Sequence, residues 1–64
     1  MTSNALINIM TTANSLGVNL NDYLLYLIIV ALGETLTLQQ LQIISKNEGI
    51  DLKNYLTYKW ELLT

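Results

Sequence analysis

The sequence predicts an all-α fold, a compact four-helix domain made of two tandem helix–turn–helix hairpins. Three observations lead to this prediction. Apolar residues recur every three or four positions in four segments, which is the period of an amphipathic helix. Glycines or short polar stretches separate these segments, and no proline interrupts any of them. The first half of the chain also aligns with the second half, without a gap, at an offset of 32 residues.

The internal match is strongest where residues 17–26 align with residues 49–58, and five of these ten positions are identical. We call two residues 32 positions apart sister residues. The match predicts a duplicated hairpin, at about 3–32 and about 35–64; the alternative is a coincidence of common helix-capping residues. The stretch Gly33-Glu34-Thr35 is too short for a flexible linker, so residues 1–64 are expected to form a single domain.

In the first half, helices are predicted at 3–16 and 20–32. Gly17 stands where a helix ends in the left-handed conformation that glycine adopts at little cost. Asn19 or Asn21 is expected to cap the next helix, and the charge of Asp22 suits its N-terminal dipole.

In the second half, helices are predicted at 37–47 and 52–63. Thr37 and Gln40 have the spacing of a capping box before the first of them, and Gly49 is expected to end it. Asp51 is expected to cap the last helix.

Sister residues that are identical are expected to stabilise each hairpin internally, so they are predicted to form the intramolecular core. These pairs are Leu20 and Leu52, Tyr23 and Tyr55, and Leu24 and Leu56.

Sister residues that differ point to a second role for the helix at 20–32. Leu25, Leu27 and Ile29 have the polar sister residues Thr57, Lys59 and Glu61. The helix at 52–63 is therefore expected to expose a polar face to solvent. The helix at 20–32 is apolar all round and must be buried on every side. A stripe of Leu25, Ile29 and Leu32 is predicted to contact a second molecule. The alternative is that the other three helices wrap this helix completely.

The tyrosines form matched pairs on the second and fourth helices. Tyr23 and Tyr55 are expected at the edge of the core, whereas Tyr26 and Tyr58 are either core-edge residues or part of a contact surface. The predicted interface residues are Leu25, Tyr26, Ile29, Leu32 and Tyr58.

The composition indicates that association with a partner, not a metal ion or a disulfide, adds to the stability of this small fold. A chain of 64 residues builds only a small core, and 52% of its residues are hydrophobic while only 12% are charged. It has no cysteine and no histidine, which excludes disulfides and Cys/His zinc sites, and its five carboxylates lack the spacing of a calcium loop. No metal site and no cofactor are predicted.

The sequence also predicts that the protein is not an enzyme. Histidine is absent, a serine or threonine nucleophile would have only one of the three lysines as its base, and the three glycines are too far apart for a phosphate-binding loop. No catalytic residue is therefore assigned.

The charge pattern disfavours nucleic acid as a partner. The net charge is −2, the only cations are three lysines, and phosphate contacts supply most of the affinity for nucleic acid. The longest apolar run, 23–32, is about half of what a membrane-spanning helix needs, so no membrane span is predicted. The N-terminus lacks the basic start of a signal peptide, which fits a cytoplasmic protein.

Two short resemblances bear on function. Ala13 and Gly17, with Ser45 and Gly49 as a weaker second copy, resemble the centre of the helix-turn-helix DNA-binding motif over some twenty residues. The segment from Thr12 to Leu24 resembles a helical segment near the C-terminus of some insertion-sequence transposases, but lacks the proline usual there. In a helix-turn-helix protein the helix at 20–32 would read bases, yet here it is acidic at its start and then apolar.

The resulting hypothesis is a small protein–protein interaction module, an adaptor, inhibitor or regulator, that binds itself as a homodimer or binds another protein. The alternative is a small DNA-binding transcriptional regulator that uses Lys53 and Lys59 of its last helix. A third possibility, a membrane-surface peptide, would require a basic polar face, which the chain lacks. Richness in Asn, Ile, Leu and Tyr, without Arg or Pro, suggests a phage or other mobile element as the source.

Overall fold

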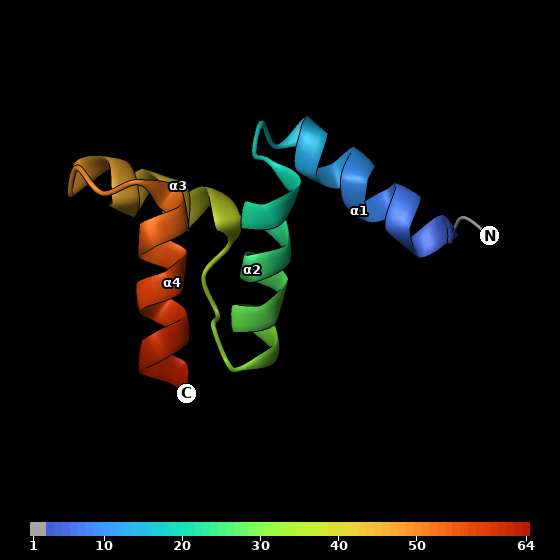
Figure 1. The fold of residues 1–64 in the computed structure, drawn as a ribbon. Coiled ribbons are helices and arrows are strands. Elements are labelled where there is room, and N and C mark those ends of the chain that lie inside the picture. Colours follow the sequence, from blue (N-terminus) through green and yellow to red (C-terminus); the bar gives the residue numbers. More distant parts are fainter. Residues whose placement is uncertain (1–2) are drawn as a thin grey trace.

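Four helices make up the part of the chain that the structure, a computed structural model, describes, which is residues 3–64 (Figure 1). They are α1 (Asn4–Ser15), α2 (Leu20–Ala31), α3 (Leu38–Asn47) and α4 (Leu52–Leu63). The described residues contain no strand. The predicted all-α, four-helix fold is confirmed, and each predicted helix end lies within one residue of the observed one.

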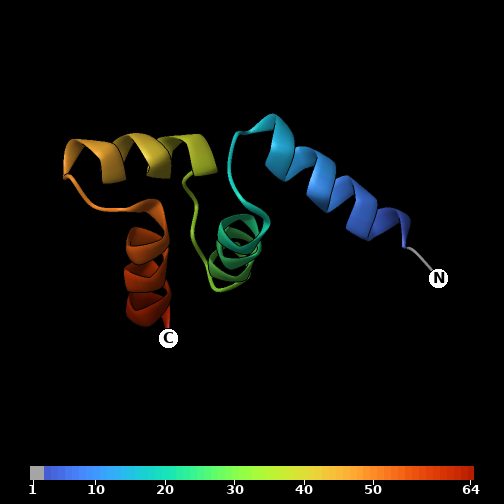
Figure 2. The ribbon, with the colours of Figure 1, turned by 45° about the horizontal axis from the view of Figure 1, so that its top comes forward.

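The second helix, α2, stands in the middle of the molecule. Its main contacts are with α4 on one side and with α1 on the other, whereas α1 makes its main contacts with α2 alone. Figures 1 and 2 show α2 and α4 side by side and running in the same direction, with α3 lying across the beginning of α4. The first helix leads away from this group, so the molecule is elongated, measuring 39 × 24 × 17 Å.

The turns after α1 and α3 have the same local geometry. Gly17 and Gly49 both adopt left-handed φ angles, 71° and 70°. The amide after each glycine donates a hydrogen bond back into the helix, from Val18 to the Ala13 carbonyl (3.1 Å) and from Ile50 to the Ser45 carbonyl (2.9 Å). This is the Schellman arrangement, which satisfies carbonyls that the helix end would leave without a partner. Both glycines end their helices as predicted, while the duplication of the whole hairpin stays a prediction.

Capping side chains set the starts of α2 and α3. The Asn19 side-chain oxygen accepts a hydrogen bond from the Asp22 amide (2.8 Å). Thr37 and Gln40 form the predicted capping box, with hydrogen bonds of 3.1 and 2.8 Å in the two directions. Asp51 does occupy the N-cap position of α4, but its carboxylate accepts no capping hydrogen bond, so its predicted role is not seen.

The core is formed by α2, α3 and α4. Its buried members are Ile29, Leu38, Leu41, Tyr55 and Leu56. The predicted core residues Tyr55 and Leu56 are confirmed, and Leu20, Leu52 and Tyr23 are half-buried. Leu24 was expected in the core and is 37% exposed, whereas Ile29, expected on an interface, is 0% exposed.

The reversal of Leu24 and Ile29 has a physical reason. Because α2 meets α4 through the side that carries Leu25 and Ile29, this side is the core face, and Leu24 turns away from it. The fourth helix makes its main contacts with α2 and α3, and the sister residue Glu61 remains exposed. The helix α2 is therefore apolar at positions where α4 is polar, because α2 lies in the middle of the molecule and α4 lies at its edge.

Truncation of Ile29 tests this assignment. We expect Ile29→Ala to lower the free energy of unfolding by about 2–5 kcal/mol, because it opens a cavity in the core. Leu32 belongs to the same predicted stripe but is 40% exposed, so Leu32→Ala should cost less than about 1 kcal/mol. Urea denaturation monitored by circular dichroism measures both. Equal losses in the two variants would contradict the core position of Ile29.

Candidate interaction surfaces

Six large aliphatic side chains lie exposed on the two N-terminal helices. One of them, Val30, is two residues from Ile28 and so lies on another side of α2. We call the other five the α1–α2 surface: Leu6, Ile7 and Met10 from α1, with Leu24 and Ile28 from α2. Each is between 37% and 50% exposed. On α1, Met10 is four residues from Leu6 and three from Ile7, and on α2, Ile28 is four residues from Leu24, so the members on each helix share a face.

The attachment of α1 leaves this surface open. Ala13 is buried and Leu16 packs against the core, so the C-terminal half of α1 holds the helix in place. Residues 3–8 are all exposed. The N-terminal half of α1 therefore projects from the body, as Figure 1 also shows.

Two residues of this surface have sister residues that are buried in the second half. Leu38 and Leu56 are 3% and 0% exposed, because Ile29 of α2 joins them in the core. Their sister residues Leu6 and Leu24 are 44% and 37% exposed. The apolar residues that pack with α2 in the second half thus have partly exposed sister residues in the first.

Charge is almost absent from this part of the molecule. Seven of the eight charged residues lie in positions 33–64, and α1 contains none. The exception is Asp22, in the first turn of α2. Asp22 is two residues from Leu24, so it lies on roughly the opposite side of the helix. The α1–α2 surface is therefore uncharged.

The structure does not gather the predicted interface residues on one surface. Ile29 is wholly buried and has no surface to offer a partner, which corrects that assignment. Leu25 and Tyr26 are half-buried against the core, and the Tyr26 hydroxyl donates to the Leu36 carbonyl (3.4 Å). Leu32 and Tyr58 are exposed.

Sequence reasoning missed the part of the surface that lies on α1, although a signal was present. The sister residues of Ile7 and Met10 are Gln39 and Gln42. The same comparison between halves that singled out α2 thus also marks α1 as more apolar than its counterpart.

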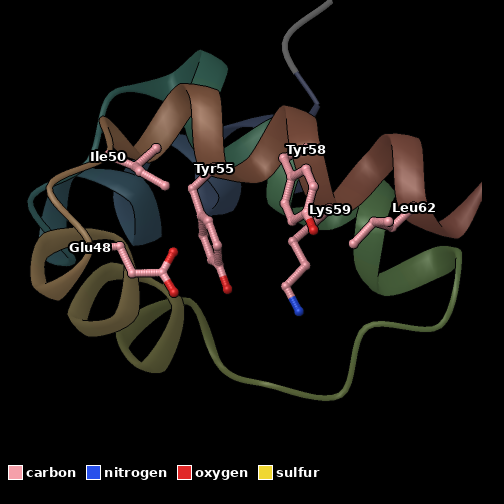
Figure 3. Close-up of a pocket in the computed structure, with 6 residues that line it drawn as sticks. All are labelled: Glu48, Ile50, Tyr55, Tyr58, Lys59 and Leu62. Carbon is pink, nitrogen blue, oxygen red and sulfur yellow. The ribbon is translucent and has the colours of Figure 1, made fainter.

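A second candidate is an open cleft of about 430 Å³ beside α4 (Figure 3). Its lining residues are Glu48, Ile50, Tyr55, Tyr58, Lys59 and Leu62. Figure 3 shows Glu48, at the end of α3, and Lys59, on α4, on either side of Tyr55. The Lys59 Nζ atom lies 5.8 Å from the centre of the Tyr55 ring and 3.5 Å from a carboxylate oxygen of Glu34. Lys59 is already paired with Glu34, while no hydrogen bond within residues 3–64 engages the Glu48 carboxylate or the hydroxyls of Tyr55 and Tyr58.

Two further kinds of site, metal centres and membrane-spanning helices, have no support in the described residues. Among residues 3–64, no three side chains of the metal-binding types come together. None of the described helices combines the length and the apolar character needed to cross a bilayer.

Comparisons with family models, curated proteins and solved structures gave no match for this chain.

The Glu34–Lys59 pair, which sequence reasoning did not anticipate, ties the α2–α3 connection to α4. The Glu34 side chain is only 7% exposed, so removing its partner leaves a poorly solvated carboxylate. We expect Lys59→Ala to lower the free energy of unfolding by about 2 kcal/mol, since water still reaches the lysine side of the pair. Lys53→Ala, at an exposed residue of the same helix, should cost less than about 0.5 kcal/mol.

Adding Glu34→Gln to Lys59→Ala should recover part of the loss in denaturation experiments, because no unpaired carboxylate remains. A double variant less stable than Lys59→Ala would contradict this explanation.

Proposed function

We propose that the protein is a small, non-enzymatic protein–protein interaction module that associates through the α1–α2 surface. The observation that carries this proposal is the exposure of five aliphatic side chains on two helices whose one charged residue, Asp22, lies on another side of α2. Exposed apolar patches mark interaction sites on proteins.

The energetics support association. Full burial of a Leu, Ile or Met side chain contributes about 1.5–3 kcal/mol. Because roughly half of each side chain is already covered, a partner would add about 1 kcal/mol for each of the five. Such a gain is large compared with the net stability of a domain of this size.

The form of α1 supports the same proposal. An isolated helix of about 12 residues is marginal in water, and most of the stability of a helix comes from packing of its apolar face. Only the C-terminal half of α1 is packed. A partner on Leu6, Ile7 and Met10 would supply the missing contacts.

The residues available for chemistry support a non-enzymatic role. The chain has neither histidine nor cysteine. Of the carboxylates, Glu34 pairs with Lys59, and Asp22 and Asp51 lie at helix starts. A DNA-binding function through α4 has less support, because Lys59 is engaged by Glu34 and Lys53 alone offers little charge for phosphate.

Site-specific photo-crosslinking tests the proposal. A benzophenone amino acid replaces Met10, and the protein is produced in cells of its native host and irradiated. We expect discrete protein adducts, either with a second copy or with another protein, because Met10 lies at the centre of the proposed contact.

The matched control places the same crosslinker at Ile43, which is 60% exposed on α3 and lies outside the α1–α2 surface. Adducts from position 10 but not from position 43 support the proposal. No adduct at position 10, or the same diffuse adducts from both positions, would contradict it.

A further inference from the structure

We infer that the partner on the α1–α2 surface is a second copy of this chain, related by a two-fold axis, so that the surface of one copy packs on the same surface of the other. This inference rests on the proposed function, because it names the occupant of the same surface. Three observations carry it: the absence of charge, the carboxylate that a head-to-tail contact would bury, and the exposure of α1 along its length.

The absence of charge removes the electrostatic cost of bringing two identical surfaces together. Like charges that face each other across an interface are costly and exclude wrong partners. Neither α1 nor the exposed stripe of α2 contains a charge, and Asp22 lies on another side of α2. Two copies can therefore meet without bringing like charges together.

A head-to-tail contact is the main alternative way for two copies to cover this surface. Within the chain, the α2 residues that pack in the core with α3 and α4 are Tyr23, Leu25, Tyr26 and Ile29. Their sister residues on α4 are Tyr55, Thr57, Tyr58 and Glu61. If α4 of one copy covered the α1–α2 surface of the next, as α2 covers the second half, Glu61 would occupy the buried position that Ile29 has.

Burial of Glu61 in that contact has no compensation. A carboxylate removed from water requires a partner charge or hydrogen bonds. The α1–α2 surface offers no cation, and the one charged residue of α1 and α2 is the acidic Asp22. Head-to-tail stacking would also form closed rings or open filaments instead of a two-fold dimer. The charges of the second half thus oppose this contact and leave the two-fold contact as the favoured one.

The molecule is large enough for such an interface. Stable dimers bury about 800 Å² on each partner, which is roughly a sixth of the 4525 Å² surface of the described chain. Ten of the twelve residues of α1 are exposed, so a partner can cover this helix along its length. A two-fold dimer would then cover both α1 helices at once.

Sedimentation velocity over a concentration series tests the inference on the purified full chain. We expect the wild type to change from monomer to dimer as its concentration rises, and to form no larger species. The variant carrying Ile7→Gln and Met10→Gln receives the sister residues Gln39 and Gln42. We expect its dissociation constant to rise at least tenfold, because it removes apolar side chains from both halves of the interface.

Both substituted residues are exposed in the monomer, and Gln favours helix, so circular dichroism should show unchanged helicity. The matched control is Ile43→Thr, which also introduces a sister residue, Thr11, at a more exposed position outside the surface. We expect this control to leave the dissociation constant unchanged.

Three outcomes would overturn the inference: a wild type that stays monomeric at all concentrations, open-ended growth into larger species, or an equal loss of association in Ile43→Thr. A monomeric wild type that still gives adducts with another protein from position 10 would reject the second copy and retain the interaction module. A monomeric wild type without such adducts would reject both.

Discussion

The packing of Ile29 of α2 with Leu41 of α3 and Leu56 of α4 is the contact on which the rest of the fold depends. It is made by three of the four helices, and its three side chains have no exposed surface. Because this contact makes α2 the middle helix, α2 must be apolar on more than one side, while α4 keeps a polar outer face. The same contact turns Leu24 and Ile28 outward, where they join α1 in the α1–α2 surface.

Charge is distributed along the chain in accordance with this arrangement. Seven of the eight charged residues lie in positions 33–64, where the core residues of α3 and α4 pack with Ile29 of α2. Two of them form the Glu34–Lys59 pair. The second half also exposes large apolar side chains, Trp60 and Leu62 among them, but these two flank the charged Glu61, whereas α1 contains no charged residue. The proposed contact between like ends follows from this difference in charge, because contact between unlike ends would bury carboxylates.

Local features of the fold could be predicted from the sequence, because they depend on neighbouring residues. The glycines at the two turns, the Asn19 cap and the Thr37–Gln40 capping box are of this kind. The core face of α2 could not be predicted, because a helix that is apolar all round has no periodicity to indicate which side meets α4. Leu24 was therefore predicted in the core and Ile29 on the interface, whereas the structure buries Ile29 and exposes Leu24. The Glu34–Lys59 pair escaped prediction for a similar reason, since it joins residues that only the tertiary fold brings together.

The central claim is that the uncovered end of the molecule pairs with itself. Isotope-filtered nuclear Overhauser spectra of an equal mixture of ¹³C-labelled and unlabelled protein test it most directly, since they detect only contacts between copies. The account predicts intermolecular contacts of the Ile7, Met10 and Ile28 methyl groups and none of the Ile29 methyl groups. Intermolecular contacts centred on Ile43 or Leu62, or no intermolecular contact at the highest concentration that stays in solution, would contradict it.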